Sequence, residues 1–209
     1  MRVAVFASGS GSNFQALIDA SISGSLQATM ALCVSNRSTA GALTRAETAG
    51  IATCVLDPSD FDEATYAQHL LGSLEQERID FIALAGYLRK IPQAVVDRFR
   101  GRMVNIHPAL LPAHGGPGMY GKHVHRAVLE AGDEFSGATV HFVDEDYDTG
   151  AIILQDTVPV LPDDNPESLA ARVLEIEHRL YPEALRLIAQ GRVRVRQGRV
   201  TITFPLQYA

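Results

Sequence analysis

The sequence predicts an α/β fold in which a Rossmann-like, mostly parallel central sheet is flanked by helices and followed by a long C-terminal helix and a hairpin. Two observations predict it. Short apolar runs rich in β-branched residues alternate with helical segments, as in βαβ units. A glycine-rich turn, SGSGSN at residues 8–13, directly follows the first of these runs. With 209 residues, 46% of them hydrophobic, we expect one domain spanning residues 1–209.

The predicted strands are short and apolar, and they cover residues 2–7, 28–35, 51–56, 80–85, 102–106, 136–143 and 151–160. The predicted helices carry apolar positions on one face, and they cover residues 14–20, 39–49, 62–77, 92–99, 123–131 and 166–190. Pro182 is expected to bend the last helix, because proline cannot donate the helical hydrogen bond. The tail, residues 193–204, alternates polar and apolar side chains around Gln197-Gly198 and predicts a hairpin.

Composition excludes several classes of protein. A formal net charge of -6 argues against a nucleic-acid partner. The two cysteines, Cys33 and Cys54, exclude a disulfide scaffold and a four-cysteine zinc cluster. The sequence has no apolar run of about 18 residues, so no membrane span is expected. Glycines follow the first short apolar run too soon for a signal peptide. We therefore expect a cytoplasmic protein, as a monomer or a homodimer.

The glycine-rich turn at residues 8–13 has the features of an anion site. Glycines allow a sharp turn, and the free amides at a helix start attract phosphate. Phe14 stands where the dinucleotide fingerprint has its third glycine, so a nicotinamide cofactor is not expected. The alternative is a plain strand-to-helix turn in which Asn13 caps the helix.

A second glycine string, Gly116–Lys122, matches the spacing of a nucleotide-binding P-loop but lacks its context. His123 follows where Ser or Thr is required, and no predicted strand precedes the loop. We interpret residues 108–121 as a flexible flap near a ligand, because long glycine loops in compact domains are often functional.

The acidic segment at residues 144–148 resembles the start of a calcium loop. The match fails at Thr149, where glycine is required, and at Gln155, where glutamate is required. A solvated acidic turn explains most of these charges. Asp148 differs, because Thr149-Gly150 leads straight into a strand and could direct its side chain inward.

Five of the seven histidines cluster within one 35-residue stretch: His107, His114, His123, His125 and His141. A zinc site built on His123 and His125 is conceivable, but no HExxH or paired-cysteine motif accompanies it, so no metal is predicted. Taken singly, most of these histidines are expected to be surface or packing residues.

His107 is the exception among the histidines. It stands at the carboxyl edge of a predicted parallel strand, where open α/β sheets bind their ligands. Asn105 lies two residues earlier, on the same face of the strand. An amide beside an imidazole, with a carboxylate available, suits acyl or formyl transfer. The alternative is that His107 only tethers a loop. No GxSxG elbow is present, so a serine acyl-enzyme is not favoured.

Five segments combine into a family pattern: ASGSGSN from residue 7, LAGYLRKI from 84, NIHPALLP from 105, GATVHFVDEDYDTGAIILQ from 137 and IEHRLYPEAL from 176. Over nearly its whole length the chain resembles the phosphoribosylglycinamide formyltransferases of the folate-dependent formyltransferase superfamily. The resemblance implies the formyltransferase fold. It also implies direct attack of the glycinamide ribonucleotide amine on the formyl carbon of the co-substrate 10-formyltetrahydrofolate, in de novo purine (IMP) biosynthesis.

The resemblance also implies roles for individual residues. Asn105 would hold the oxyanion, His107 would donate the proton, and Asp148 would support the imidazolium. The ribonucleotide would be held at its phosphate and ribose by Gly11, Ser12, Asn13 and Glu177. The folate would lie against Leu88, Arg89, Lys90, Ile91, Asn105 and Asp144. Residues 1–100 would then form the phosphate-binding half, and residues 101–209 the catalytic and folate-binding half.

The chain departs from the family pattern at two places. The segment at residues 113–122 is longer than in the commonest members, which affects the folate entrance. The arginine expected near residue 64 is missing, because Glu63 and Ala64 stand there. The folate glutamate tail must then meet another cation.

Three other functions are alternatives. Formyltetrahydrofolate deformylases usually carry an extra N-terminal domain, whereas this sequence starts directly with the first predicted strand, so a deformylase is not expected. Methionyl-tRNA and sugar formyltransferases normally need a longer chain, and the acidic charge weighs against tRNA. A nucleotide-binding regulatory module would explain the glycine-rich turn but would leave Asn105, His107 and Asp148 unused.

Overall fold

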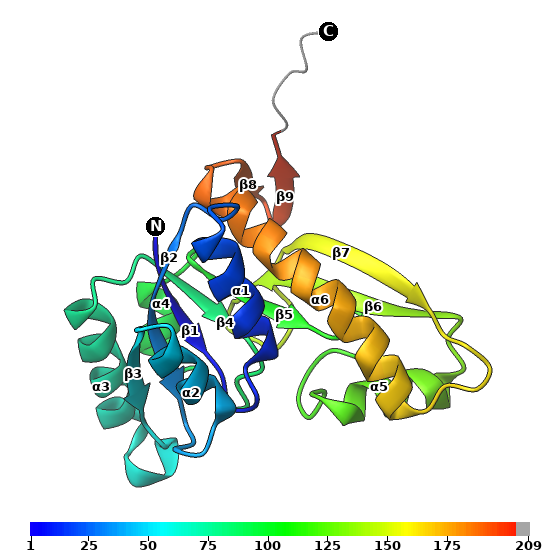
Figure 1. The fold of residues 1–209 in the computed structure, drawn as a ribbon, viewed down its shortest axis with the longest axis horizontal. Helices are drawn as coiled ribbons and strands as arrows, with labels where there is room; N and C mark the ends of the chain where they lie inside the picture. The colour runs from blue at the N-terminus through cyan, green and yellow to red at the C-terminus, as the bar shows by residue number, and fades with distance from the viewer. Residues whose placement is uncertain (204–209) are drawn as a thin grey trace, which may run out of the picture.

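The computed structural model describes residues 1–203, in which a seven-stranded sheet has the order β3-β2-β1-β4-β5-β6-β7 (Figure 1). Its strands are β1 (Arg2–Phe6), β2 (Thr29–Ser35), β3 (Ala52–Val55), β4 (Phe81–Leu84), β5 (Met103–His107), β6 (Phe135–Phe142) and β7 (Ile152–Pro159). Strands β1 to β5 pair in parallel, and β6 and β7 extend the sheet by antiparallel pairing. The predicted fold class is confirmed.

Helices cover both faces of the sheet: α1 (Ser12–Ile22), α2 (Gly41–Thr48), α3 (Glu63–Gln76), α4 (Gln93–Arg98), α5 (Lys122–Ala131) and α6 (Pro166–Ala189). Side chains along β1 alternate between the two faces of the sheet, so their contacts show which helices cover each face. Val3 and Val5 pack in one buried cluster with α1, α2 and α6. Ala4 and Phe6, on the opposite face, pack in a second cluster with α3 and α4. Both faces of the parallel strands are therefore buried, as expected for this class.

The long helix α6 runs continuously through Pro182 and is fixed to the sheet beneath it (Figure 1). At its start, Asn165 accepts hydrogen bonds from the backbone, and Ser168 completes a capping box. Near its middle, the buried Tyr181 hydroxyl donates to the carbonyl of Leu84 at 2.8 Å and lies 3.4 Å from that of Val104. These bonds join α6 to β4 and β5, which lie next to each other in the sheet.

The C-terminal hairpin has the predicted form. Strands β8 (Val193–Arg196) and β9 (Arg199–Ile202) pair around Gln197, and the last residue of the predicted hairpin, Phe204, lies outside the described residues. A short 3₁₀ turn, Pro58–Asp60, had no sequence prediction. In the described part of the chain no helix is both long and apolar enough to span a membrane.

The sheet order creates one position where a ligand is expected. Strand β1 lies between β2 and β4, so the connections on its two sides run in opposite directions. Where the connections of an open parallel sheet change direction in this way, a crevice forms at the carboxyl ends of the strands. The loops there are tied together by Ser8, whose hydroxyl donates to Asn36 Oδ1 at 2.5 Å and accepts from the Leu88 N–H at 2.9 Å.

Candidate active site

A cleft of about 680 Å³ opens at this crevice. Every site residue predicted from the sequence lines it: Gly11, Ser12, Asn13, Leu88, Arg89, Lys90, Ile91, Asn105, His107, Asp144, Asp148 and Glu177. The cleft is bounded by the ends of β1, β4 and β5, by the loop between β6 and β7, and by α6. Residues spread over most of the chain therefore converge on one site.

Asn105, His107 and Asp148 meet inside the cleft. Asn105 Nδ2 lies 3.5 Å from Asp148 Oδ1, and His107 Nδ1 lies 3.6 Å from Asp148 Oδ2. The side chains of His107 and Asp148 are only 4% and 10% exposed. The loop turns tightly to place Asp148, which has φ 58°, and a Cβ on the nearby Gly150 would overlap the Phe142 carbonyl. The inward direction predicted for Asp148 is confirmed.

His141 also belongs to this cluster, although its sequence context suggested a surface or packing residue. Strand pairing sets it opposite Asn105, with its Nε2 3.2 Å from Asn105 Nδ2 and 3.5 Å from Asp148 Oδ1. Its Nδ1 donates to the Phe142 carbonyl at 2.8 Å. The relevant signal is the antiparallel register between β5 and β6, which the flanking residues of His141 do not reveal.

Burial and charge oppose one another in this cluster. Burial disfavours ionisation of Asp148, but hydrogen bonds from His141 and the Gly116 N–H, with the nearby imidazoles, hold its pKa below the usual value. Burial lowers the pKa of His107, while Asp148 and a hydrogen bond to the His114 carbonyl act in the opposite direction. The cluster therefore pairs an ionised carboxylate with an imidazole that gives up its proton readily.

The glycine-rich loop at residues 108–121 lies against these groups. His107 Nε2 lies 2.8 Å from the His114 carbonyl oxygen, and the Gly116 N–H donates to Asp148 Oδ2 at 2.9 Å. Packing is close, since a Cβ on Gly115 would lie 3.3 Å from that of Asp148. The predicted proximity of this loop to the site is confirmed. The loop tether foreseen for His107 is also present, together with its contact to Asp148.

The start of α1 forms the other end of the cleft. Gly11 adopts a left-handed conformation (φ 74°), so the helix begins at Ser12 rather than Phe14, and no side chain caps it. The alternative that Asn13 caps this helix is wrong, because Asn13 lies inside the helix and its Oδ1 accepts no hydrogen bond, while its Nδ2 donates to Glu177 Oε2. The first-turn amides lack a side-chain acceptor and lie at the positive end of the helix dipole, which favours an anion.

Glu177 reaches the same end of the cleft from α6. It is 7% exposed, and burial raises the pKa of its carboxyl to about 7, against the opposing effect of the Asn13 hydrogen bond. A buried carboxyl beside an amide can accept hydrogen bonds from ligand hydroxyls.

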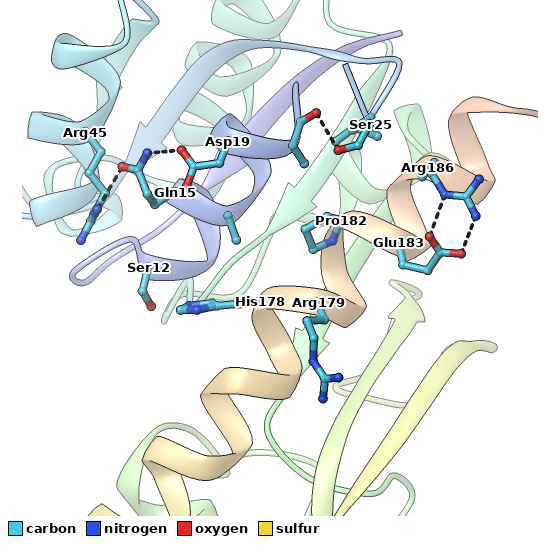
Figure 2. A pocket seen from close by; sticks show the side chains of 13 residues that line it. Ser12, Gln15, Asp19, Ser25, Arg45, His178, Arg179, Pro182, Glu183 and Arg186 are labelled. Atoms are coloured by element: carbon cyan, nitrogen blue, oxygen red, sulfur yellow. Dashed lines mark hydrogen bonds and ion pairs between the residues drawn. The ribbon is translucent and has the colours of Figure 1, made fainter. Parts of the chain in front are cut away.

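A second cleft of about 730 Å³ lies between α1 and α6 (Figure 2). Four of its charged side chains have partners within it: Arg186 pairs with Glu183 at 2.6 Å, and the neutral Gln15 accepts from Arg45 at 3.0 Å and donates to Asp19 at 2.8 Å. It shares only Ser12 with the predicted site residues. The first cleft is therefore the candidate active site.

The metal alternative finds no matching geometry in the described residues. Across residues 1–203, no group of three His, Cys, Asp or Glu side chains is arranged to hold a metal ion. His125 is buried and lines the cleft, and burial together with the nearby His107 lowers its pKa to about 4.

Comparison with known proteins agrees with this geometry. The formyl transferase family model matches residues 1–185. The phosphoribosylglycinamide formyltransferase of Escherichia coli K12 is 40% identical over 199 residues, covering 95% of this chain and 92% of that protein. The chain belongs to the phosphoribosylglycinamide formyltransferases. Glycinamide ribonucleotide transformylase 1 of Symbiobacterium toebii shares the fold, with a TM-score of 0.91, 40% identity, and coverage of 97% and 93% of the two chains.

Two further matches bear on function. The trifunctional purine biosynthetic protein of Drosophila melanogaster is 46% identical over 193 residues, which cover 91% of this chain but only 14% of that protein. A formyltetrahydrofolate deformylase from Pseudomonas syringae has a TM-score of 0.86, but at 24% identity it shows only the shared fold. The family model, the Escherichia coli enzyme and the Symbiobacterium toebii structure confirm the predicted family and, with it, a formyl-transferring enzyme.

Proposed function

We propose that the chain transfers the formyl group of 10-formyltetrahydrofolate to the amine of glycinamide ribonucleotide, a step of purine synthesis. The observation that carries this proposal is the convergence of Asn105, His107 and Asp148 beside the uncapped start of α1 in one cleft. One end of the cleft suits a phosphate, and its centre suits acyl-type chemistry on a nearby amine.

The proposed reaction breaks one bond to nitrogen and forms another. The amine attacks the formyl carbon, the bond from that carbon to the folate nitrogen breaks, and an amine proton passes to the departing nitrogen. Asn105 donates a hydrogen bond to the oxygen on which negative charge develops. His107 gives its proton to the departing folate nitrogen and regains the one that the amine loses, and the ionised Asp148 stabilises its imidazolium and assists proton transfer.

The two substrates would bind in different parts of the cleft. The amides of Ser12 and Asn13 would receive the phosphate, and Glu177 the ribose hydroxyls. The folate ring would lie between residues 88–91 and the loop at residues 144–148, both of which line the cleft. In this proposal residues 1–100 chiefly hold the phosphate and residues 101–209 supply catalysis and much of the folate site.

The folate tail needs a cation other than the missing family arginine. Helix α3 begins with Glu63 and Ala64, which offer none. Arg37, Arg89 and Lys90 line the cleft, so they are the nearest candidates for the tail carboxylates.

One assay tests the proposal against its nearest rival. The protein is mixed with 10-formyltetrahydrofolate, with and without glycinamide ribonucleotide, and the folate absorbance is followed. Turnover that requires the ribonucleotide is expected. Equal turnover without it would indicate a deformylase, and no turnover in either mixture would favour a binding module. Activity is expected to survive exhaustive chelation, and its loss would revive the zinc alternative.

A further inference from the structure

The loop at residues 108–121 sets which nitrogen of His107 carries a fixed proton. The nitrogen Nε2 lies 2.8 Å from the backbone oxygen of His114. A carbonyl oxygen only accepts hydrogen bonds, so Nε2 must carry a proton whether the imidazole is neutral or charged. The other nitrogen, Nδ1, faces Asp148 Oδ2 at 3.6 Å. It is therefore the atom that gains and loses the catalytic proton.

The His114 carbonyl is itself held by a contact outside the cleft. The His114 imidazole Nε2 lies 2.6 Å from Asp133 Oδ2, just beyond the end of α5. His114 has φ 53°, a left-handed backbone conformation that residues other than glycine rarely adopt. Such a conformation persists only where surrounding contacts hold it, and the ion pair with Asp133 is a contact of that kind.

We propose that His114 and Asp133 are positioning residues, whose ion pair holds the His114 carbonyl against Nε2 of His107 and so keeps Nδ1 free to exchange the catalytic proton. This inference rests on the proposed function, in which His107 donates a proton. Neither side chain lines the cleft, so both act through His107.

The same loop offers a matched control. At its other end, Lys122 Nζ lies 2.6 Å from Glu167 Oε1, the same separation as in the His114–Asp133 pair. The Lys122–Glu167 pair is exposed and joins the loop region to α6, and Glu167, unlike Lys122, does not line the cleft. Removing it tests general anchoring of the loop, whereas removing the His114–Asp133 pair tests the position of one carbonyl.

The charged surroundings of His107 indicate the direction of a pH effect. Asp148, His114, His125 and His141 all interact with it electrostatically. Among these influences, the hydrogen bond to the His114 carbonyl raises the pKa of His107 against the effect of burial. Loss of that bond should lower this pKa further, so the alkaline limb of the kcat profile, where the proton donor His107 loses its proton, should move to lower pH.

The test uses His114→Gly, which tolerates the left-handed backbone, and Asp133→Ala. Each is expected to lower kcat about three- to tenfold with nearly unchanged KM values, because a partly exposed ion pair orients a loop only modestly. The ¹⁵N signals of the His107 ring should change from one Nε2–H tautomer to a mixture. Asp133→Asn keeps an acceptor oxygen and should restore much of the native tautomer. Glu167→Ala removes the control pair from the side that lies outside the cleft and should leave both readouts unchanged.

Three results would overturn the inference: native kcat with a single His107 tautomer in both variants, losses that simply add in the His114→Gly/Asp133→Ala double variant, or equal losses in Glu167→Ala. The ring spectra are recorded on the free enzyme. They therefore decide the positioning role even if the formyl-transfer assay shows no turnover, which would count against the proposed function alone.

Discussion

Asn13 and Glu177 lie 164 positions apart in the chain and are joined by a hydrogen bond of 2.5 Å from Asn13 Nδ2 to Glu177 Oε2. The bond connects the first turn of α1 to the middle of α6 across the proposed ribonucleotide end of the cleft. Within residues 1–203, Asn13 Oδ1 is buried without a hydrogen-bond partner. That free acceptor and the adjacent carboxyl make this pair sensitive to both ligand and pH.

Glu177 should make the protein less stable as pH rises. Its folded pKa is about 7 against an ordinary value of 4.5, so the unfolded chain loses this proton first. The contribution of protonated Glu177 to the free energy of unfolding is therefore fully present below pH 4.5. It is lost as pH rises to about 7, by roughly 3 kcal/mol at about 1.4 kcal/mol per pKa unit. Glu177→Gln should remove this slope in urea denaturation at pH 5 and pH 8. An equal native-minus-variant difference at both pH values would contradict the prediction.

His125 should contribute the opposite slope. Its folded pKa of about 4 lies below the ordinary 6.5, so the unfolded chain takes up this proton first. Its contribution is intact above pH 6.5 and is lost as pH falls toward 4, by up to roughly 3 kcal/mol. His125→Asn should therefore flatten acid destabilisation between pH 7 and pH 5 in the same measurement. An unchanged acid slope in this variant would show that the folded protein takes up this proton as readily as the unfolded chain, against the prediction.

Sequence patterns predicted the sheet, its helices and the central site residues because those signals are local. Asn105 and His107 end an apolar strand, and Asp148 precedes a glycine that leads into another. His141 was missed because its role depends on pairing between β5 and β6. Glu177 was found only through the family motif, since its burial depends on α6 crossing the cleft.

The start of α1 shows the same limit on a smaller scale. The sequence SGSGSN predicts a turn before a helix, but it does not say which glycine adopts the left-handed backbone. In the structure Gly11 does so, and the helix begins two residues earlier than the apolar pattern indicated. The proposed anion site therefore uses the amides of Ser12 and Asn13, which the pattern assigned to a loop.

Removing the charge of Asp148 should nearly abolish catalysis. Asp148→Asn keeps an oxygen that can accept from the Gly116 N–H but loses the carboxylate that favours the His107 imidazolium. We expect a loss of at least roughly a hundredfold in kcat, and a similar loss for His107→Ala. Steady-state kinetics with both substrates measures this. Asp163→Asn makes the same change at an exposed position away from the cleft and should stay near native. Near-native rates for both site variants would refute the assigned roles.

Gly11→Ala should weaken binding of the ribonucleotide more than binding of the folate. At φ 74°, an added Cβ would lie 2.7 Å from Ala42 Cα and 2.8 Å from its Cβ, so α1 or α2 must shift. A strained backbone and a close contact together cost about 1–3 kcal/mol. We expect a lower melting temperature and a KM for the ribonucleotide raised more than that for the folate. Gly9→Ala is the matched control, because nothing lies within 4 Å of its added Cβ. If both variants raise the ribonucleotide KM equally, the left-handed turn at Gly11 does not shape the phosphate site.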